Sequence, residues 1–113
     1  MHEMSLAEGV LQLVEETACR EQASRVKLVV LQIGKLSSVA PEALSFCFEA
    51  VTRGSIADGA ALEIVEVPGA GWCMQCAATV PIAERYGACP VCGSHQVQAT
   101  DGTEKRVREI GSD

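Results

Sequence analysis

Four cysteines arranged in two pairs constrain this chain more than any other feature of its sequence. Two residues separate the members of each pair and twelve residues separate the pairs, which are Cys73 with Cys76 and Cys89 with Cys92. Two such turns bring four sulfurs to one tetrahedral metal site, and a site closed by four thiolates is structural rather than catalytic. The spacing predicts a zinc ribbon. A rubredoxin-like iron site is the rival, because tetrahedral sulfur suits both metals.

Disulfides, a redox dithiol or four unrelated core thiols are weaker interpretations of the same cysteines. The 113 residues contain no apolar run of about 18 residues that could span a membrane. The opening residues also lack the basic and apolar regions of a signal peptide. We therefore expect a cytoplasmic protein, in which thiols stay reduced and bind metal.

The charge of the chain argues against nucleic acid as a partner. The formal net charge is −6 at neutral pH, and an acidic surface repels a phosphate backbone. The only basic cluster, formed by Lys105, Arg106 and Arg108, is flanked by Glu104 and Glu109. We expect neither a nucleic acid nor a membrane as partner.

The first helix is predicted from apolar residues that recur at three- and four-residue steps between Ala7 and Ala18. Ser5 and Glu8 form a capping-box pair, in which each side chain satisfies a backbone N–H of the other residue. This pair places the start of the helix after residues 1–4.

Three further elements and a change of composition predict two domains. Branched residues indicate an interior strand over residues 25–33, a helix is expected from Pro41 to a stop at Gly54, and residues 61–67 alternate as a half-buried strand. From Gly69 onward the periodicity is lost and cysteines are frequent. The domains predicted from this change are a first one of residues 1–68, completed by a C-terminal strand within 102–113, and a ribbon of residues 69–101.

A second metal site is predicted at Met1, His2 and Glu3. The terminal amine, the backbone nitrogen of His2 and its imidazole can reach one ion, and Glu3 adds an amide nitrogen or a carboxylate. Nitrogen and oxygen donors in a tetragonal set suit Ni(II) or Cu(II). Loading should improve as pH rises through neutrality, because an amine with a reference pKa of about 7.7 to 8.0 must lose its proton. The alternative is a solvated terminus without metal.

Three other residues of metal-ligating type are not expected to bind metal. His95 lies three residues after the last cysteine of the ribbon, where a surface side chain is favoured over a substitute zinc ligand. Cys19 and Cys47 fall on the predicted helices and are expected to pack in the core.

In combination, these motifs resemble the HypA/HybF family of hydrogenase maturation nickel chaperones, nearly from end to end. The matching segments are the opening Met1 to Leu6, Ile33-Gly34, Phe46 to Glu49, Arg53-Gly54-Ser55, and the paired cysteines with Trp72 before the first pair and Pro90 inside the second. The chain departs from some members at Ala77 and Gly93, where they have histidine after a cysteine pair, and at Ala40, where they have an acid. Glu42 is an acid close to that position.

The resemblance implies an α+β fold in which a small three-stranded sheet and two helices form a nickel domain, with a four-cysteine zinc ribbon inserted before the last strand. It implies that His2, the Met1 amine and Glu3 carry Ni(II) to the large subunit of a [NiFe] hydrogenase, together with a HypB-type GTPase. Urease maturation proteins are further partners that it implies. It leaves open whether the chain is a monomer or a weak homodimer.

The residues themselves favour a carrier over an enzyme. No nucleophile, base and orienting residue occur together, and only two histidines are present. The alternatives are a zinc-ribbon interaction or regulatory module with an inert terminus, and a rubredoxin-like electron carrier. Nickel binding that depends on His2 would distinguish the nickel carrier from the zinc-ribbon module, and iron–thiolate colour would identify the electron carrier.

Overall fold

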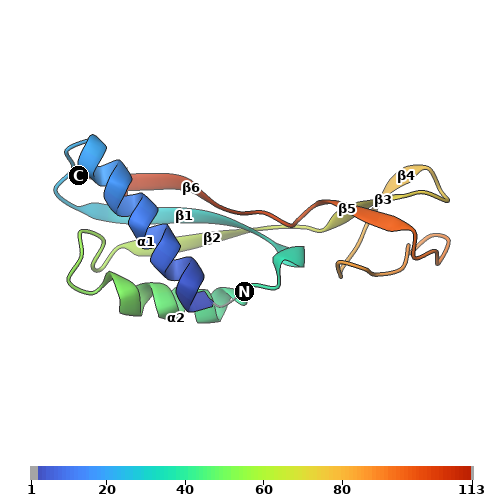
Figure 1. Ribbon diagram of the computed structural model, residues 1–113, viewed down its shortest axis with the longest axis horizontal. Helices are drawn as coiled ribbons and strands as arrows, with labels where there is room; N and C mark the ends of the chain where they lie inside the picture. The colour runs from blue at the N-terminus through green and yellow to red at the C-terminus, as the bar shows by residue number, and fades with distance from the viewer. Residues whose placement is uncertain (1–2, 113) are drawn as a thin grey trace. The chain divides into compact units, whose positions relative to one another are not determined.

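The computed structural model describes residues 3–112, which form two three-stranded sheets, two α-helices and a short 3-10 helix (Figure 1). The strand orders are β2–β1–β6 and β4–β3–β5. This architecture confirms the predicted α+β fold, in which a small sheet with two helices is combined with a separate ribbon. The elements in chain order are α1 (Glu3–Arg20), β1 (Val26–Gly34), η1 (Lys35–Ser37), α2 (Pro41–Thr52), β2 (Ala61–Val67), β3 (Ala70–Cys73), β4 (Ala78–Pro81), β5 (Val97–Asp101) and β6 (Lys105–Ser112).

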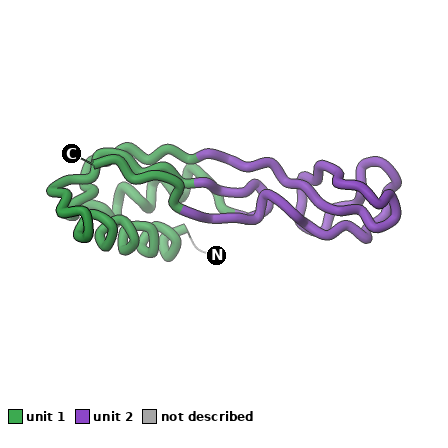
Figure 2. The backbone as a smooth tube through the Cα atoms, turned by 90° about the horizontal axis from the view of Figure 1, so that it is seen from above, with its two compact units in different colours: residues 1–31, 39–64, 107–113 green, residues 32–38, 65–106 purple. Residues whose placement is uncertain are grey.

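The chain divides into two compact units (Figure 2). Unit 1 comprises residues 1–31, 39–64 and 107–113, and it contains both α-helices. Unit 2 comprises residues 32–38 and 65–106, and it contains β3, β4, β5 and the four paired cysteines. Within residues 3–112, no helix is both long enough and apolar enough to cross a bilayer.

The core of unit 1 contains the contact between α1 and α2, together with buried residues of β1 such as Val26 and Val29. Helix α1 buries the predicted apolar stripe, which includes Val10 and Val14, and α2 buries Leu44 and Phe48. The one polar residue of this helix core is Thr52, whose hydroxyl donates to the Phe48 carbonyl at 2.8 Å. Its burial is therefore compensated by a hydrogen bond.

Two sequence expectations for α1 are wrong. The helix begins at Glu3, so Ser5 lies inside the first turn instead of capping it with Glu8. An acidic side chain is favourable at the positive end of the helix dipole, which supports this earlier start. Cys19 is exposed, because it follows the inward-facing Ala18 and each residue turns a helix by about 100°. Core packing was therefore the wrong expectation for Cys19.

The predicted interior strand is the central strand of its sheet. Strand β1 is buried along most of its length, since β2 pairs with one edge and β6 with the other. A C-terminal strand was expected within residues 102–113, and β6 is this strand; it lies at the edge of the sheet and exposes its charged side chains.

The core of unit 2 includes a residue that the sequence pattern did not reveal. Leu36 of η1 is 5% exposed and packs in one cluster with Val80, Ile82, Cys73 and Cys89. Its backbone N–H also donates to the Gly102 carbonyl at 2.7 Å. The hydrophobic core of the ribbon thus depends on a segment that precedes it by more than thirty residues.

Three glycines in unit 2 let chain segments touch backbone to backbone. A Cβ on Gly34 would overlap the backbone of Gly102, and a Cβ on Gly102 would lie 2.7 Å from the Cα of Gly69. Gly102 also has a φ of 86°, which side chains disfavour. Larger residues are sterically excluded at these positions.

Candidate metal centre

The structure brings the sulfurs of Cys73, Cys76, Cys89 and Cys92 together, all within 4.8 Å of one another. The Sγ atoms of Cys73 and Cys92 are 3.6 Å apart, and those of Cys76 and Cys89 are 3.9 Å apart. Zinc–thiolate bonds of about 2.3 Å in a tetrahedron require sulfur separations of about 3.8 Å. The two measured separations lie on either side of this value, so the four sulfurs fit a tetrahedral metal ion.

The first cysteine turn is positioned by the hairpin of β3 and β4. Cys73 ends β3, where it lies opposite Ala78 of β4 and Val97 of β5. The backbone N–H of Cys76 donates to the Cys73 sulfur at 3.4 Å, and Ala77 then takes a φ of 53°. The left-handed residue after the second cysteine redirects the chain into β4.

The second turn repeats this geometry on a loop that precedes β5. The backbone N–H of Val91 donates to the Cys89 sulfur at 3.4 Å, and that of Gly93 donates to the Cys89 carbonyl at 2.8 Å. Gly93 has a φ of 76°, a conformation that suits glycine. Backbone N–H groups directed at sulfur stabilise a thiolate, and in the second turn they face Cys89.

Burial differs among the four sulfurs. Cys73 and Cys89 are 0% and 2% exposed and belong to the core of unit 2, Cys76 is partly buried, and Cys92 is exposed. The cluster is therefore anchored on the ribbon core along one side and reaches the surface on the other.

The thiols influence one another before any metal binds. A hydrogen bond with the Cys92 thiol, assisted by burial, raises the pKa of Cys76 to about 12. The backbone N–H groups of Cys92 and Val91 lower the pKa of Cys89 to about 7, although burial opposes them. A bound metal must therefore displace the proton of Cys76, whereas Cys89 is about half ionised at pH 7.

No second group of three or more metal-ligating side chains occurs within residues 3–112. His95 is exposed and lies outside the cysteine cluster. The expectation of a surface side chain at His95 agrees with this placement.

Of the predicted nickel ligands, Met1 and His2 lie outside the described residues, and Glu3 opens α1. Oε2 of Glu3 accepts the backbone N–H of Ala40 at 3.1 Å. Ala40 is the N-cap residue of α2 and makes no side-chain cap of its own. The Glu3 carboxylate thus links the starts of the two helices, a contact that sequence spacing does not reveal.

A small α+β unit combined with a ribbon of four clustered thiols defines a metal-binding protein. The comparisons with known proteins identify its family. A sequence model described as "HypA: Hydrogenase/urease nickel incorporation, metallochaperone, hypA" matches residues 1–112. The chain therefore belongs to the HypA family of metallochaperones, and it is not an enzyme.

Several relatives are similar over nearly their whole length. Hydrogenase maturation factor HypA of Dechloromonas aromatica (strain RCB) is 81% identical over 110 residues, which cover 97% of each chain. The protein of the same name from Albidiferax ferrireducens is 60% identical over 110 residues, again 97% of each chain. The solution structure of the Ni metallochaperone HypA from Helicobacter pylori is 32% identical with a TM-score of 0.71, and the match covers 99% of this chain and 97% of that one.

Proposed function

We propose that the protein binds Ni(II) at its N-terminus and delivers it during maturation of a [NiFe] hydrogenase. The ligands in this proposal are the Met1 amine, the backbone nitrogen and imidazole of His2, and Glu3. The observation that carries the proposal is the family match, whose description is nickel incorporation, over a chain that begins with a tripeptide of nickel-suited donors.

The contact between Glu3 and Ala40 bears on how Glu3 contributes. Its carboxylate accepts the Ala40 N–H, so it holds the start of α1 against the start of α2. The backbone nitrogen of Glu3 remains the donor that we assign to nickel, with the carboxylate as positioning group. Glu42, exposed in the first turn of α2, is not assigned a ligand role.

We propose that the cysteine cluster holds a structural Zn(II). The sulfur separations fit a tetrahedral ion, and four thiolates leave no open position for a substrate. Bound zinc would supply a cross-link between the two cysteine turns. The ribbon of residues 69–101 then acts as a docking module, and residues 1–68 with 102–113 act as the nickel-carrying domain.

The partners that we propose are a HypB-type GTPase and the large subunit of the hydrogenase, in the cytoplasm. Relatives named hydrogenase maturation factor support the hydrogenase as recipient. The family description also names urease, so urease maturation proteins are a second class of partner.

Nickel titration of the untagged protein tests the proposal. We expect about one Ni(II) per chain, with a square-planar absorption band that His2→Ala removes and His95→Ala leaves unchanged. The matched control is informative because His95 is an exposed histidine outside the proposed site. Equal uptake by wild type and His2→Ala would contradict the proposal and favour a ribbon-bearing adaptor protein.

A further inference from the structure

The outward face of α2 carries an aromatic residue that neither the core nor the metal sites use. Phe46 is 72% exposed. At about 100° per residue, Phe46 shares one helix face with Glu42 and Glu49, both exposed, and the exposed Arg53 follows as the C-cap residue of α2. Aromatic side chains are enriched at the centres of protein–protein interfaces, where polar residues form the surrounding rim.

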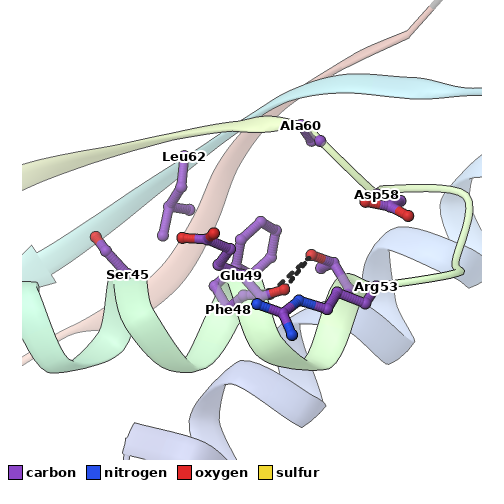
Figure 3. A pocket seen from close by; sticks show the side chains of 9 residues that line it. Ser45, Phe48, Glu49, Arg53, Asp58, Ala60 and Leu62 are labelled. Atoms are coloured by element: carbon purple, nitrogen blue, oxygen red, sulfur yellow. Dashed lines mark hydrogen bonds between the residues drawn. The ribbon is translucent and has the colours of Figure 1, made fainter.

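A hollow of about 450 Å³ adjoins this face, between the C-terminal half of α2 and the start of β2 (Figure 3). Figure 3 shows Ser45 and Glu49 of α2 facing Leu62 of β2, with Asp58 on the connecting loop. Phe48 and Leu62 contribute apolar surface to the hollow. The complete lining consists of Ser45, Phe48, Glu49, Thr52, Arg53, Asp58, Gly59, Ala60 and Leu62.

The loop that borders the hollow is held in place by hydrogen bonds. Oδ2 of Asp58 accepts the Gly54 N–H at 2.9 Å, and the Arg25 guanidinium donates to the Asp58 carbonyl at 2.8 Å. The hydroxyl of Ser55 donates to the Thr52 carbonyl at 2.6 Å. The hollow is therefore preformed, which lowers the entropy loss when a ligand binds.

The charge of the hollow favours a cation. Its lining contains two carboxylates, Glu49 and Asp58, against one guanidinium, Arg53. The last carbonyls of α2 add the partial negative charge of a helix C-terminus. Glu42, farther along the same face, adds another negative charge, and the whole chain is at −6.

We propose that this face docks a protein segment in which an apolar side chain lies within one helical turn of a lysine or arginine. The apolar side chain packs on Phe46, and the basic group enters the hollow between Glu49 and Asp58. The exposed face of α2 is thus a partner surface distinct from both metal sites. The partner segment that fits it is a basic, amphipathic helix.

The same charges argue against other occupants. The carboxylates of the hollow would repel an acidic segment. Two copies of a chain with a net charge of −6 also repel each other. Charge complementarity therefore selects a basic partner over a second copy.

Fluorescence anisotropy with designed helical peptides and the full-length, zinc-loaded protein tests this inference. Three peptides of about 14 residues, or four helical turns, carry leucine with arginine, leucine with glutamate, or alanine with arginine on one face. We expect the first to bind at least about tenfold more tightly than the other two at low salt. Phe46→Ala should weaken binding of the leucine–arginine peptide about tenfold. The Glu49→Gln, Asp58→Asn double variant should weaken it about fivefold, and the binding that remains should depend less on salt.

The control is Leu13→Ala, which removes a 42% exposed leucine of α1 outside this face. It should leave peptide affinity unchanged, and none of the variants should alter nickel or zinc stoichiometry. Equal binding of the basic and acidic peptides, or insensitivity to Phe46→Ala, would overturn the proposal. Self-association in sedimentation that Phe46→Ala abolishes would also overturn it, in favour of a second copy as occupant.

Discussion

Replacing Leu36 with alanine tests whether a segment outside the cysteine ribbon supports its metal site. Leu36 is 5% exposed and contacts the cluster that contains Cys73 and Cys89. The remaining buried members are only Val80 and Ile82. Leu36 is therefore one of three buried aliphatic side chains in the cluster that contains the buried sulfurs, and Val97 and Ala99 pack against this cluster from partly buried positions.

The magnitude follows from the atoms removed. Leucine to alanine deletes three carbons, worth about 0.8 kcal/mol each when buried, and the cavity left behind raises the total to about 3 kcal/mol. Folding of a small ribbon is coupled to metal binding, so this loss appears in the metal affinity. A loss of about 3 kcal/mol raises the zinc dissociation constant about 150-fold.

Competition with a chromophoric chelator measures that constant directly. The matched control is Val91→Ala, because Val91 lies inside the second cysteine pair but is 76% exposed. The control should stay within about threefold of wild type. A Leu36→Ala protein that also stayed within this range would refute the role of Leu36 in the ribbon core.

Three further predictions concern other contacts. Glu3→Ala should lower the free energy of unfolding by about 1 kcal/mol in thermal melts, because it removes the acceptor of the Ala40 N–H. Glu3→Gln keeps an acceptor oxygen and should retain most of this stability. Zinc binding should release about 0.4 more protons at pH 6 than at pH 7. Cys89, with a pKa of about 7, is more protonated at pH 6 than at pH 7, whereas Cys76 is protonated at both pH values. Zinc affinity should therefore be lower at pH 6 than at pH 7. Unchanged release would contradict these pKa values. Gly34→Ala should destabilise the fold by more than about 3 kcal/mol in denaturant titrations, since its Cβ would overlap the crossing backbone.

Sequence patterns located the elements of unit 1 because their signals are local. The strand expected at residues 61–67 is β2, and the strand expected at 25–33 differs from β1 by one residue at each end. Each of these strands is predicted from the pattern of its own side chains, so its pairing partners need not be known.

The strands of the ribbon left no comparable pattern. The inward positions of β3 are Gly71 and Cys73, small or sulfur-bearing residues in place of the branched apolar residues that indicate a strand. Strand formation here follows from pairing with β4 and β5 around the cysteine turns. Cysteine spacing predicted the cluster, but not the sheet that supports it.

Contacts between segments that are distant in the chain could not be predicted from the sequence either. Leu36 is a single apolar residue in a three-residue helix, and the hydrogen bond from Ala40 to Glu3 spans 37 residues. Neither contact has a periodicity that could reveal it. Both depend on which segments the folded chain places side by side.

The most direct test of nickel carriage compares the chain that begins at Met1 with one carrying a short N-terminal extension. The extension preserves His2 and Glu3 but moves the free amine away from them. We predict that the extended protein loses specific Ni(II) binding and its square-planar absorption while it keeps one zinc per chain and the same thermal melt. Equal nickel affinity in the two proteins would contradict a site built on the terminal amine.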